Sequence, residues 1–253
     1  MIGFYTLFKR EVARFMLDSL DTIAPPTVSV VLFLLIFGSA LGPRLGTVDG
    51  VPYAQFVMPG LLFMSVVINA FLNPAYSLLQ SRWDGNIFDP LSSPLSSVHI
   101  SLAVVLAGMV RGLVVGLLVA LSGWTLLRFQ WVNPAATAFY LVLVALVFAS
   151  LGSVVGLWTK GWEGVNTISV FIIDPLVMLG GVFYSLDMVE GVPPLDVLIR
   201  WNPLTTMVGG LRATMLETSG TSLAAGLIMT GGMAVLFLSA SLLLFRYGYH
   251  LKA

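Results

Sequence analysis

The stretch that decides the fold is LAVVLAGMVRGLVVGLLVAL, residues 102–121, which holds a single charged side chain, Arg111. A helix needs about 20 apolar residues to cross the hydrocarbon core of a bilayer. Closed barrels also span membranes, but their strands alternate between apolar and polar residues over about ten positions. Neither this stretch nor residues 141–151 alternate in that way. The sequence therefore predicts membrane-spanning helices.

Apolar stretches of this kind fill most of the chain. Of its 253 residues, 58% are hydrophobic and 9% are charged, whereas an ordinary soluble domain has about 25% charged residues. We expect six spans, at residues 25–42, 55–79, 99–121, 136–157, 165–186 and 223–245. With their connections these use the whole length. The predicted fold class is thus an all-α integral membrane protein with one transmembrane domain over residues 1–253.

The basic residues indicate the topology. An even number of spans places both termini on one side, and seven Lys and Arg residues fall on that side against four on the other. The positive-inside rule then puts both termini in the cytoplasm of a multi-pass protein of the cell (inner or plasma) membrane. A net charge of zero gives no basic face for nucleic acid, and the lack of cysteine excludes disulfides and thiolate metal sites.

Residues 1–24 predict an amphipathic helix. Apolar side chains such as Phe4, Phe8 and Phe15 recur at spacings of three and four, with Arg10 and Arg14 between them. A Phe-rich helix with basic partners, placed before a span, is expected in the cytoplasmic headgroup layer. A membrane anchor with no further role is the alternative interpretation.

The connection at residues 81–98 is the longest predicted cytoplasmic segment. Asp89-Pro90 has the pattern of a helix N-cap followed by proline at the first helical position, and Ser93-Pro94 would stop such a helix within a turn. Ile87, Phe88, Leu91 and Leu95 give the segment one apolar side. We expect a short bent element on the membrane surface that contacts a soluble partner. A solvated loop is the alternative.

The connection at residues 187–222 is too long for a turn and too apolar for a flexible loop. Pro193-Pro194 opens one apolar run, and Asn202-Pro203 repeats the pattern of a cap followed by a first-position proline. We expect two short helices that re-enter the membrane from the outside, which is permitted where protein or a cavity shelters their polar ends.

Several polar residues fall inside the predicted spans. Arg111 and Asp174 each lie near the middle of a span, where a charge costs roughly 2.5–3.5 kcal/mol and needs shelter. They could face a translocation path, pair with each other, or form a structural polar contact, and Asp174 before a proline could mark a kink. Asn69 and Asn73 predict either a polar stripe on the path or a hinge. Glycines at positions 108, 112, 116, 152, 156, 231 and 232 favour close helix packing.

The chemistry of an enzyme is missing from the sequence. No Gly-x-x-x-x-Gly-Lys-Ser/Thr loop occurs, so the chain is not expected to hydrolyse ATP by itself. His99 and His250 lack clustered carboxylates, which argues against a metal site. Serine nucleophiles lack a plausible base. We therefore expect neither catalysis nor a bound cofactor.

The order of these motifs resembles the type-2 permeases of ABC transporters, over essentially the entire chain. The segment at 81–98 is similar to the coupling helix of that family at Asp84, Gly85 and Ser93-Pro94-Leu95. The family's later motifs match Gly181-Val182-Phe183-Tyr184-Ser185, then Asn202-Pro203-Leu204 and Leu211-Arg212. One departure is Asp89-Pro90, where the family usually continues an apolar helix.

The resemblance implies an ATP-driven exporter of an amphiphile: a lipid, a glycolipid, a polysaccharide or a hydrophobic drug. Two copies of the chain would pair among membrane lipids, and two ABC ATP-binding subunits carrying ATP and Mg²⁺ would dock beneath them. The implied coupling residues are Arg10, Arg14, Arg82, Asp84, Gly85, Ile87, Phe88, Leu91, Ser93, Pro94 and Leu95. The implied outer gate comprises Phe183, Tyr184, Trp201, Asn202, Pro203 and Arg212. An ion-coupled secondary transporter using Arg111 and Asp174, or a membrane assembly scaffold, is the alternative.

Overall fold

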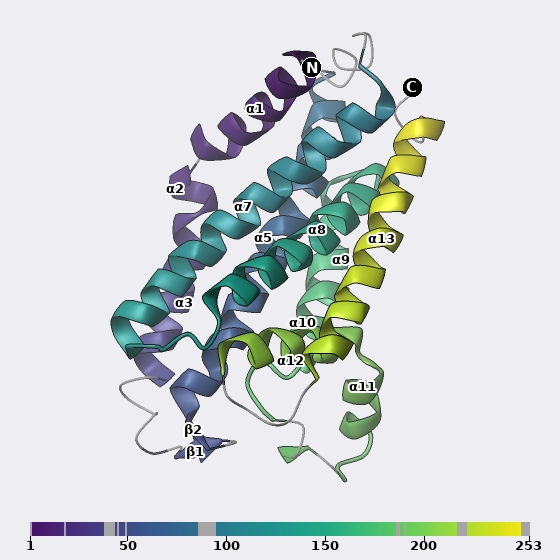
Figure 1. Cartoon of the computed structure of the whole chain (residues 1–253). Helices are drawn as coiled ribbons and strands as arrows, with labels where there is room; N and C mark the ends of the chain where they lie inside the picture. The colour runs from purple at the N-terminus through teal and green to yellow at the C-terminus, as the bar shows by residue number, and fades with distance from the viewer. Residues whose placement is uncertain are drawn as a thin grey trace.

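The computed structural model describes residues 2–17, 19–37, 44, 46–48, 50–85, 95–185, 188–189, 191–216 and 222–248. The elements are helical except for one small hairpin (Figure 1). In chain order they are α1 (Ile2–Leu17), α2 (Ser19–Thr22), α3 (Ala24–Leu35), β1 (Thr47–Val48), β2 (Val51–Pro52), α5 (Tyr53–Trp83), α7 (Ser97–Leu127), α8 (Pro134–Trp158), α9 (Trp162–Ile168), the π-helical turn η2 (Ser169–Ile173), α10 (Asp174–Leu179), α11 (Leu195–Trp201), α12 (Pro203–Met215) and α13 (Leu223–Tyr247).

Five helical segments in the described chain are long and apolar enough to cross a membrane. They are α5, α7, α8, the continuous run from α9 through α10, and α13. They overlap five of the six predicted spans, and the run through α10 ends at Leu179, short of the predicted limit at residue 186. The remaining predicted span, 25–42, contains α3, which has 12 residues and falls short of the length that a crossing requires. Residues 38–43 lie outside the described chain, so the sixth span stays a prediction.

The start of α1 and the end of α13 lie at the same end of the bundle (Figure 1). Leu7 of α1 and Phe245 of α13 belong to one buried cluster with Leu78 and Ile100. This proximity agrees with the predicted placement of both termini on one side. The hairpin of β1 and β2 and the short helices α11 and α12 occupy the opposite end, called here the outer end.

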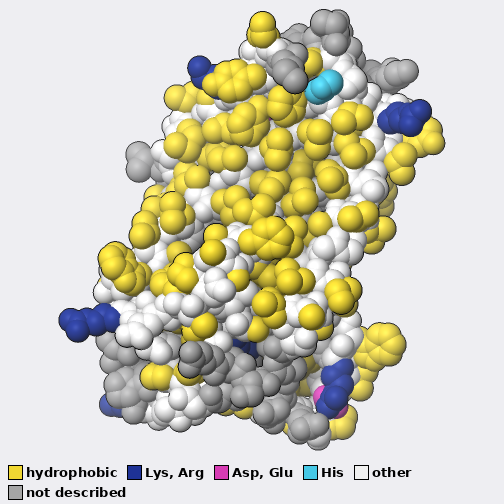
Figure 2. Space-filling view, in the orientation of Figure 1, with side chains coloured by type: hydrophobic (Ala, Val, Ile, Leu, Met, Phe, Trp, Pro, Cys, Tyr) yellow, Lys and Arg dark blue, Asp and Glu magenta, His cyan; other side chains and the backbone are white. Residues whose placement is uncertain are grey.

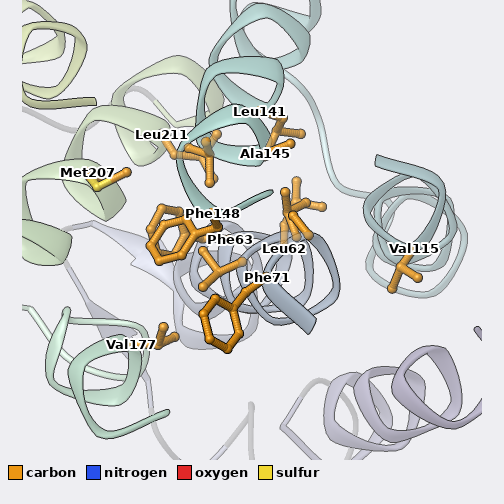
Figure 3. Close-up of a cluster of buried hydrophobic side chains, with 14 of the residues drawn as sticks. Leu62, Phe63, Phe71, Val115, Leu141, Ala145, Phe148, Val177, Met207 and Leu211 are labelled. Atoms are coloured by element: carbon orange, nitrogen blue, oxygen red, sulfur yellow. The ribbon is translucent and has the colours of Figure 1, made fainter. Parts of the chain in front are cut away.

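Helix α5 is the centre of the bundle. It packs against α7 along one side and α8 along another, and also contacts α12. Phe63 and Phe71 of α5 are fully buried, and the ring of Phe63 meets the ring of Phe148 edge to face at 6.3 Å. Figure 3 shows these rings surrounded by side chains from α8, α10 and α12. The core is thus built around one helix.

Glycine allows α8 and α7 to approach α5 this closely. A Cβ atom on Gly152 of α8 would overlap the carbonyl group of Phe71, and one on Gly108 of α7 would overlap the ring of Pro74. The predicted role of glycine in helix packing is confirmed at positions 108, 112, 116, 152 and 156, whose virtual Cβ atoms all meet α5. Gly231 and Gly232 of α13 meet nothing within 4 Å.

Helix α13 is held by buried hydroxyl groups. The Ser241 Oγ lies 3.0 Å from the Ser101 Oγ of α7 and 2.9 Å from the Ser153 Oγ of α8, and all three side chains are fully buried. Nearer the outer end, Thr230 donates to the Tyr140 hydroxyl, which donates in turn to the Met207 carbonyl. These bonds join α7, α8 and α13 to one another and to α12. The hydropathy of the spans does not indicate which positions form them.

The segment from α9 to α10 is interrupted in its middle. The turn η2 is π-helical and is followed directly by Asp174 and Pro175. Proline has no N–H for the helical ladder, and π-helical turns accommodate such irregularities. The sequence interpretation of Asp174-Pro175 as a local distortion therefore agrees with the structure.

The outer connection contains the two short helices that were predicted. The Oδ1 atom of Asn202 accepts a hydrogen bond from the Leu204 N–H, and Pro203 occupies the first helical position of α12. Helix α12 is almost wholly buried against α13, α8 and α5. Helix α11 is exposed along most of its length. Re-entry into a membrane stays a prediction for both helices.

Candidate functional site

The end of the bundle that carries the termini presents a continuous platform made by α1 and the start of α7. The ring of Phe4 meets the ring of His99 at a centroid distance of 6.0 Å. Leu95 packs over the first turn of α1, so that a Cβ on Gly3 would lie 3.1 Å from the Leu95 Cδ2 atom. The end of the 81–98 segment therefore rests directly on the amphipathic helix. We call α1 with residues 95–99 the inner platform.

Glu11 anchors the inner platform to α5. Its side chain is buried, and its Oε2 atom accepts hydrogen bonds from the Ser77 hydroxyl at 2.6 Å and from the Arg14 Nη2 at 2.8 Å. The Arg10 Nη2 lies 3.4 Å from the other carboxylate oxygen. A buried carboxylate is stable only when it is paired and hydrogen-bonded, and these three partners meet that requirement.

The sequence interpretation missed Glu11. The apolar stripe predicted for residues 1–24 included Phe4, Phe8 and Phe15, whereas the buried residues of α1 are Leu7, Glu11 and Phe15. The spacing of four residues between these three places Glu11 in the middle of the buried face. That spacing was the available signal. Arg10 and Arg14, predicted as coupling residues, are the ion-pair partners of this carboxylate.

Arg82, another predicted coupling residue, joins the end of α5 to the end of α8. Its guanidinium donates hydrogen bonds to the carbonyl oxygens of Gly156, Leu157 and Thr159. The last carbonyl groups of a helix have no partners within the helix, and a cation is favourable there. Arg82 thus ties the end of α5 to the end of α8.

The remaining predicted coupling residues divide into two groups. Asp84 and Gly85 are exposed just beyond the end of α5, and Gly85 has a φ of +71°, which glycine adopts without strain. Ile87, Phe88, Leu91, Ser93 and Pro94 lie outside the described residues, as does Asp89-Pro90. The shape of that stretch stays a prediction.

Arg111 and Asp174 do not form an ion pair with each other among the described side chains. Arg111 donates to the Thr22 carbonyl oxygen at 3.2 Å, at the junction between α2 and α3. The Oδ1 atom of Asp174 is buried without a hydrogen-bond partner in the described structure. The two charges therefore have separate environments, and the hypothesis that they pair is wrong for this conformation.

Asn69 and Asn73 face the interior of the protomer. Asn69 is 2% exposed and donates to the Ser65 carbonyl one turn earlier in α5. Asn73 is 4% exposed, and its Nδ2 atom has no hydrogen-bond partner within the described chain. Neither side chain lines an open surface in this conformation. Their predicted place on a translocation path therefore requires a rearrangement of the helices.

Most of the predicted gate residues gather around the loop after α10. The Arg212 guanidinium donates to the Gly181 carbonyl at 2.8 Å and lies over the Phe56 ring at 4.0 Å. Asn202 donates to the Leu176 carbonyl at 2.7 Å, so it caps α12 and ties that helix to α10. Tyr184 donates to the Leu179 carbonyl at 2.7 Å, and burial raises the pKa of its hydroxyl above the ordinary value.

Aromatic rings extend this outer site toward α3. Phe33 lies 5.4 Å from Phe183 between ring centroids, and Phe37 stacks on Phe33 at 4.6 Å. The Tyr53 hydroxyl donates to the Phe183 carbonyl at 3.0 Å. The sequence interpretation did not single out Phe33, Phe37 or Tyr53. Trp201, by contrast, is 85% exposed at the end of α11, although it directly precedes Asn202 in the chain.

No group of three or more His, Asp and Glu residues gathers where the structure describes the chain in a way that could hold a metal ion. His99 is engaged at the start of α7, where its Nδ1 atom lies 2.7 Å from the Ser96 hydroxyl. At both ends of the bundle, buried charges, helix caps and ring contacts join separate helices.

Comparison with known proteins identifies the family. The sequence model of the ABC-2 type transporter matches residues 3–216. The chain is 33% identical over 243 residues to the inner membrane transport permease YadH of Escherichia coli K12, covering 94% of this chain and 91% of that protein. Nodulation protein J of Sinorhizobium fredii NGR234 is 25% identical over 231 residues, covering 88% and 84%, and that of Rhizobium leguminosarum bv. viciae is 22% identical over 220 residues, covering 85% and 83%. The chain belongs to the ABC-2 type transporter family of membrane permeases.

Proposed function

We propose that this chain is the membrane-spanning subunit of an ATP-driven exporter. A separate ABC ATPase subunit binds ATP and Mg²⁺ and docks on the inner platform, which faces the cytoplasm. The observation that carries this proposal is the connection of the platform to three spans. Family membership supports it, because ABC-2 permeases generally work with an ABC ATPase subunit.

The contacts of the inner platform supply the coupling route. A force on residues 95–99 acts directly on α7 and, through Leu95 and Phe4, on α1. Helix α1 acts on α5 through the bond between Glu11 and Ser77. The end of α5 acts on α8 through Arg82. One docked subunit therefore moves the central helix and both of its principal neighbours together.

Two copies of the chain make up the translocation unit in this proposal. The segment from α9 to α10 is an apolar span with only 22% of its most apolar window buried, and Phe171 on it is 76% exposed. Asp174 lies in the same segment, and intramembrane carboxylates normally face a protein interior or a polar cavity. A second copy against this segment would shelter the charge. Two ATPase subunits would then complete the assembly.

The proposed substrate is an amphiphile, such as a lipid, glycolipid, polysaccharide or hydrophobic drug. The interior is mainly apolar, and its buried polar side chains include Asn69, Asn73 and Arg212. Such an interior suits a molecule with a large apolar part and a small number of polar groups. The outer site at Arg212 and Phe183 would open for release. Ion coupling is less favoured, since Arg111 and Asp174 have separate environments.

The deciding experiment is purification of the tagged chain from its native membrane in mild detergent, with identification of its partners and an ATPase assay. We expect an ATP-binding subunit in equal stoichiometry. The chain has no cysteine, so single cysteines can be introduced without background. Asp84→Cys, just beyond the inner end of α5, should cross-link to that subunit, and Trp201→Cys at the outer end should not. A lone chain without a nucleotide-binding partner would contradict the proposal.

A further inference from the structure

A groove runs between α7 and α8 near the outer end. It has a volume of about 530 Å³ and is lined almost entirely by apolar side chains, among them Leu117, Leu121, Ala138 and Val142. This volume falls within the roughly 300–1,000 Å³ of ordinary ligand sites. Figure 2 shows hydrophobic side chains across the middle of this face, with Lys and Arg side chains near its margins. An apolar groove on an apolar face of two spans suits contact with the hydrocarbon of a bilayer.

The end of α7 shapes the mouth of this groove. Arg128 adopts a φ of +50°, in the left-handed region that ends a helix. The chain then turns through Phe129, whose ring meets Trp131 edge to face at 5.3 Å. Trp131 consequently lies near Trp124 of α7, and both indole rings line the groove. Tryptophan favours the boundary between hydrocarbon and headgroups.

A second hollow, more polar than the groove, adjoins it at this mouth. It has a volume of about 610 Å³ and is lined by Arg128 and Gln130 together with Trp124, Trp131 and Pro134, the last three of which also line the groove. Arg128 is exposed, and its side chain has no ion pair or hydrogen bond within the described residues. The apolar groove thus leads to the exposed guanidinium of Arg128.

We propose that this site binds an anionic glycerophospholipid of the surrounding membrane. One acyl chain lies in the groove between α7 and α8, the glycerol region lies between Trp124 and Trp131, and the phosphate accepts hydrogen bonds from Arg128. Charge complementarity selects this occupant, because guanidinium groups donate two hydrogen bonds to phosphate in a matched geometry. The site is distinct from the inner platform and from the outer site at Arg212, so it does not depend on the proposed transport function.

The test uses quenching of Trp124 and Trp131 by lipids brominated in their acyl chains. A reporter version of the full chain carries Phe in place of Trp83, Trp158, Trp162 and Trp201. It is placed in vesicles of phosphatidylcholine with increasing fractions of brominated phosphatidylglycerol or brominated phosphatidylcholine. We expect half-maximal quenching at an about fivefold lower fraction of the anionic lipid, the ratio that one basic residue near the surface provides.

Four substitutions separate the contributions of charge and groove. Arg128→Gln should abolish the preference for the anionic lipid, whereas Arg128→Lys should retain most of it. Ala138→Phe should fill the groove and reduce quenching by both lipids. Arg200→Gln is the matched control, since Arg200 is also at the outer end but on α11, at the opposite edge of the bundle from the end of α7 (Figure 1). It should leave both curves unchanged.

Three results would overturn the proposal. Equal curves for the two lipids would show that Arg128 does not select an anionic headgroup. A preference that survives Arg128→Gln would place the selectivity elsewhere. Weak quenching by both lipids in the reporter chain would show that protein, either a second copy or another partner, covers the groove.

Discussion

Helices α5 and α13 are both long apolar spans, yet they occupy opposite kinds of environment. In α5, 78% of the most apolar window is buried within the chain, and in α13 only 17% is buried. Helix α13 is the more apolar of the two. Hydropathy therefore places both helices in a membrane but does not determine which one becomes the centre of the bundle.

The difference comes from the surfaces that face each helix. Neighbours of α5 present glycine toward it, including Gly108 and Gly152, so that backbones approach closely. Helix α13 carries its own glycine pair, Gly231 and Gly232, on a face that meets nothing within 4 Å. In this bundle, glycines on the helices around α5 allow its close enclosure, whereas Gly231 and Gly232 of α13 do not contribute to packing within the chain. Four substitutions probe this contrast, in order of decreasing effect.

Gly152→Val should have the largest effect. The new side chain would overlap the Phe71 carbonyl group, which cannot move without displacing α5. We expect destabilisation of about 3 kcal/mol or more, as for strongly overpacked cores. The yield of monodisperse protein and its thermal midpoint in detergent measure this effect. The matched control is Gly232→Val on α13, and an equal loss in both variants would show that the enclosure of α5 does not matter.

Glu11→Ala should have the next largest effect. Removal of the carboxylate leaves the buried Ser77 hydroxyl without its partner and leaves Arg14 without its counter-ion. A loss of about 2–3 kcal/mol is expected, because breaking a buried ionic contact exposes the desolvation cost of the remaining partner. Denaturation in mixed detergent measures it.

Glu11→Gln is the matched control for this variant, since it can still accept from Ser77. It should lose less than Glu11→Ala. Equal stability of Glu11→Ala and the unaltered chain would show that Glu11 does not anchor α1 to α5.

Arg82→Met should have a moderate effect at the inner end of α5. The substitution retains much of the length of the side chain but removes its hydrogen bonds to the carbonyl oxygens of Gly156 and Thr159. We expect about 1.5 kcal/mol of lost stability and faster hydrogen exchange over residues 155–162. Arg246→Met, at an exposed position in the last turn of α13, should leave that exchange unchanged. Unaltered protection in Arg82→Met would contradict the coupling of α5 to α8.

Gly232→Ala should have the smallest effect on stability. Whether it stabilises or destabilises the protein indicates what covers this face of α13. Alanine is favoured over glycine in a helix interior by about 1 kcal/mol, and the Cβ at this position meets no atom of the chain. A slight gain in thermal midpoint is therefore expected if lipid covers this face. A clear loss would indicate that another protein surface packs there as tightly as α8 packs on α5.

The predicted elements were recovered more fully than the predicted contacts. Asn202-Pro203 predicted the start of α12 because capping depends on adjacent residues. The long apolar stretches predicted five helices for the same local reason. The spacing of Leu7, Glu11 and Phe15 indicated that Glu11 is buried, but its partner Ser77 lies on another helix and could not be predicted from that spacing. Of the alternatives left open for Arg111 and Asp174, direct pairing is absent from this conformation, because depth in a span does not determine the direction in which a side chain points.

The sequence by itself determined that this chain is an all-helical membrane protein, approximately where five of its long helices lie, and to which family it belongs. These properties depend on residues close together in the chain and on the cost of burying charge and unpaired backbone in hydrocarbon. Only the tertiary structure decided that α5 lies at the centre, that Ser241 joins Ser101 to Ser153, and that Arg82 caps α8. Such contacts join residues far apart in the sequence. They fix the position of each helix in the bundle, which hydropathy does not, because the spans have similar hydropathy.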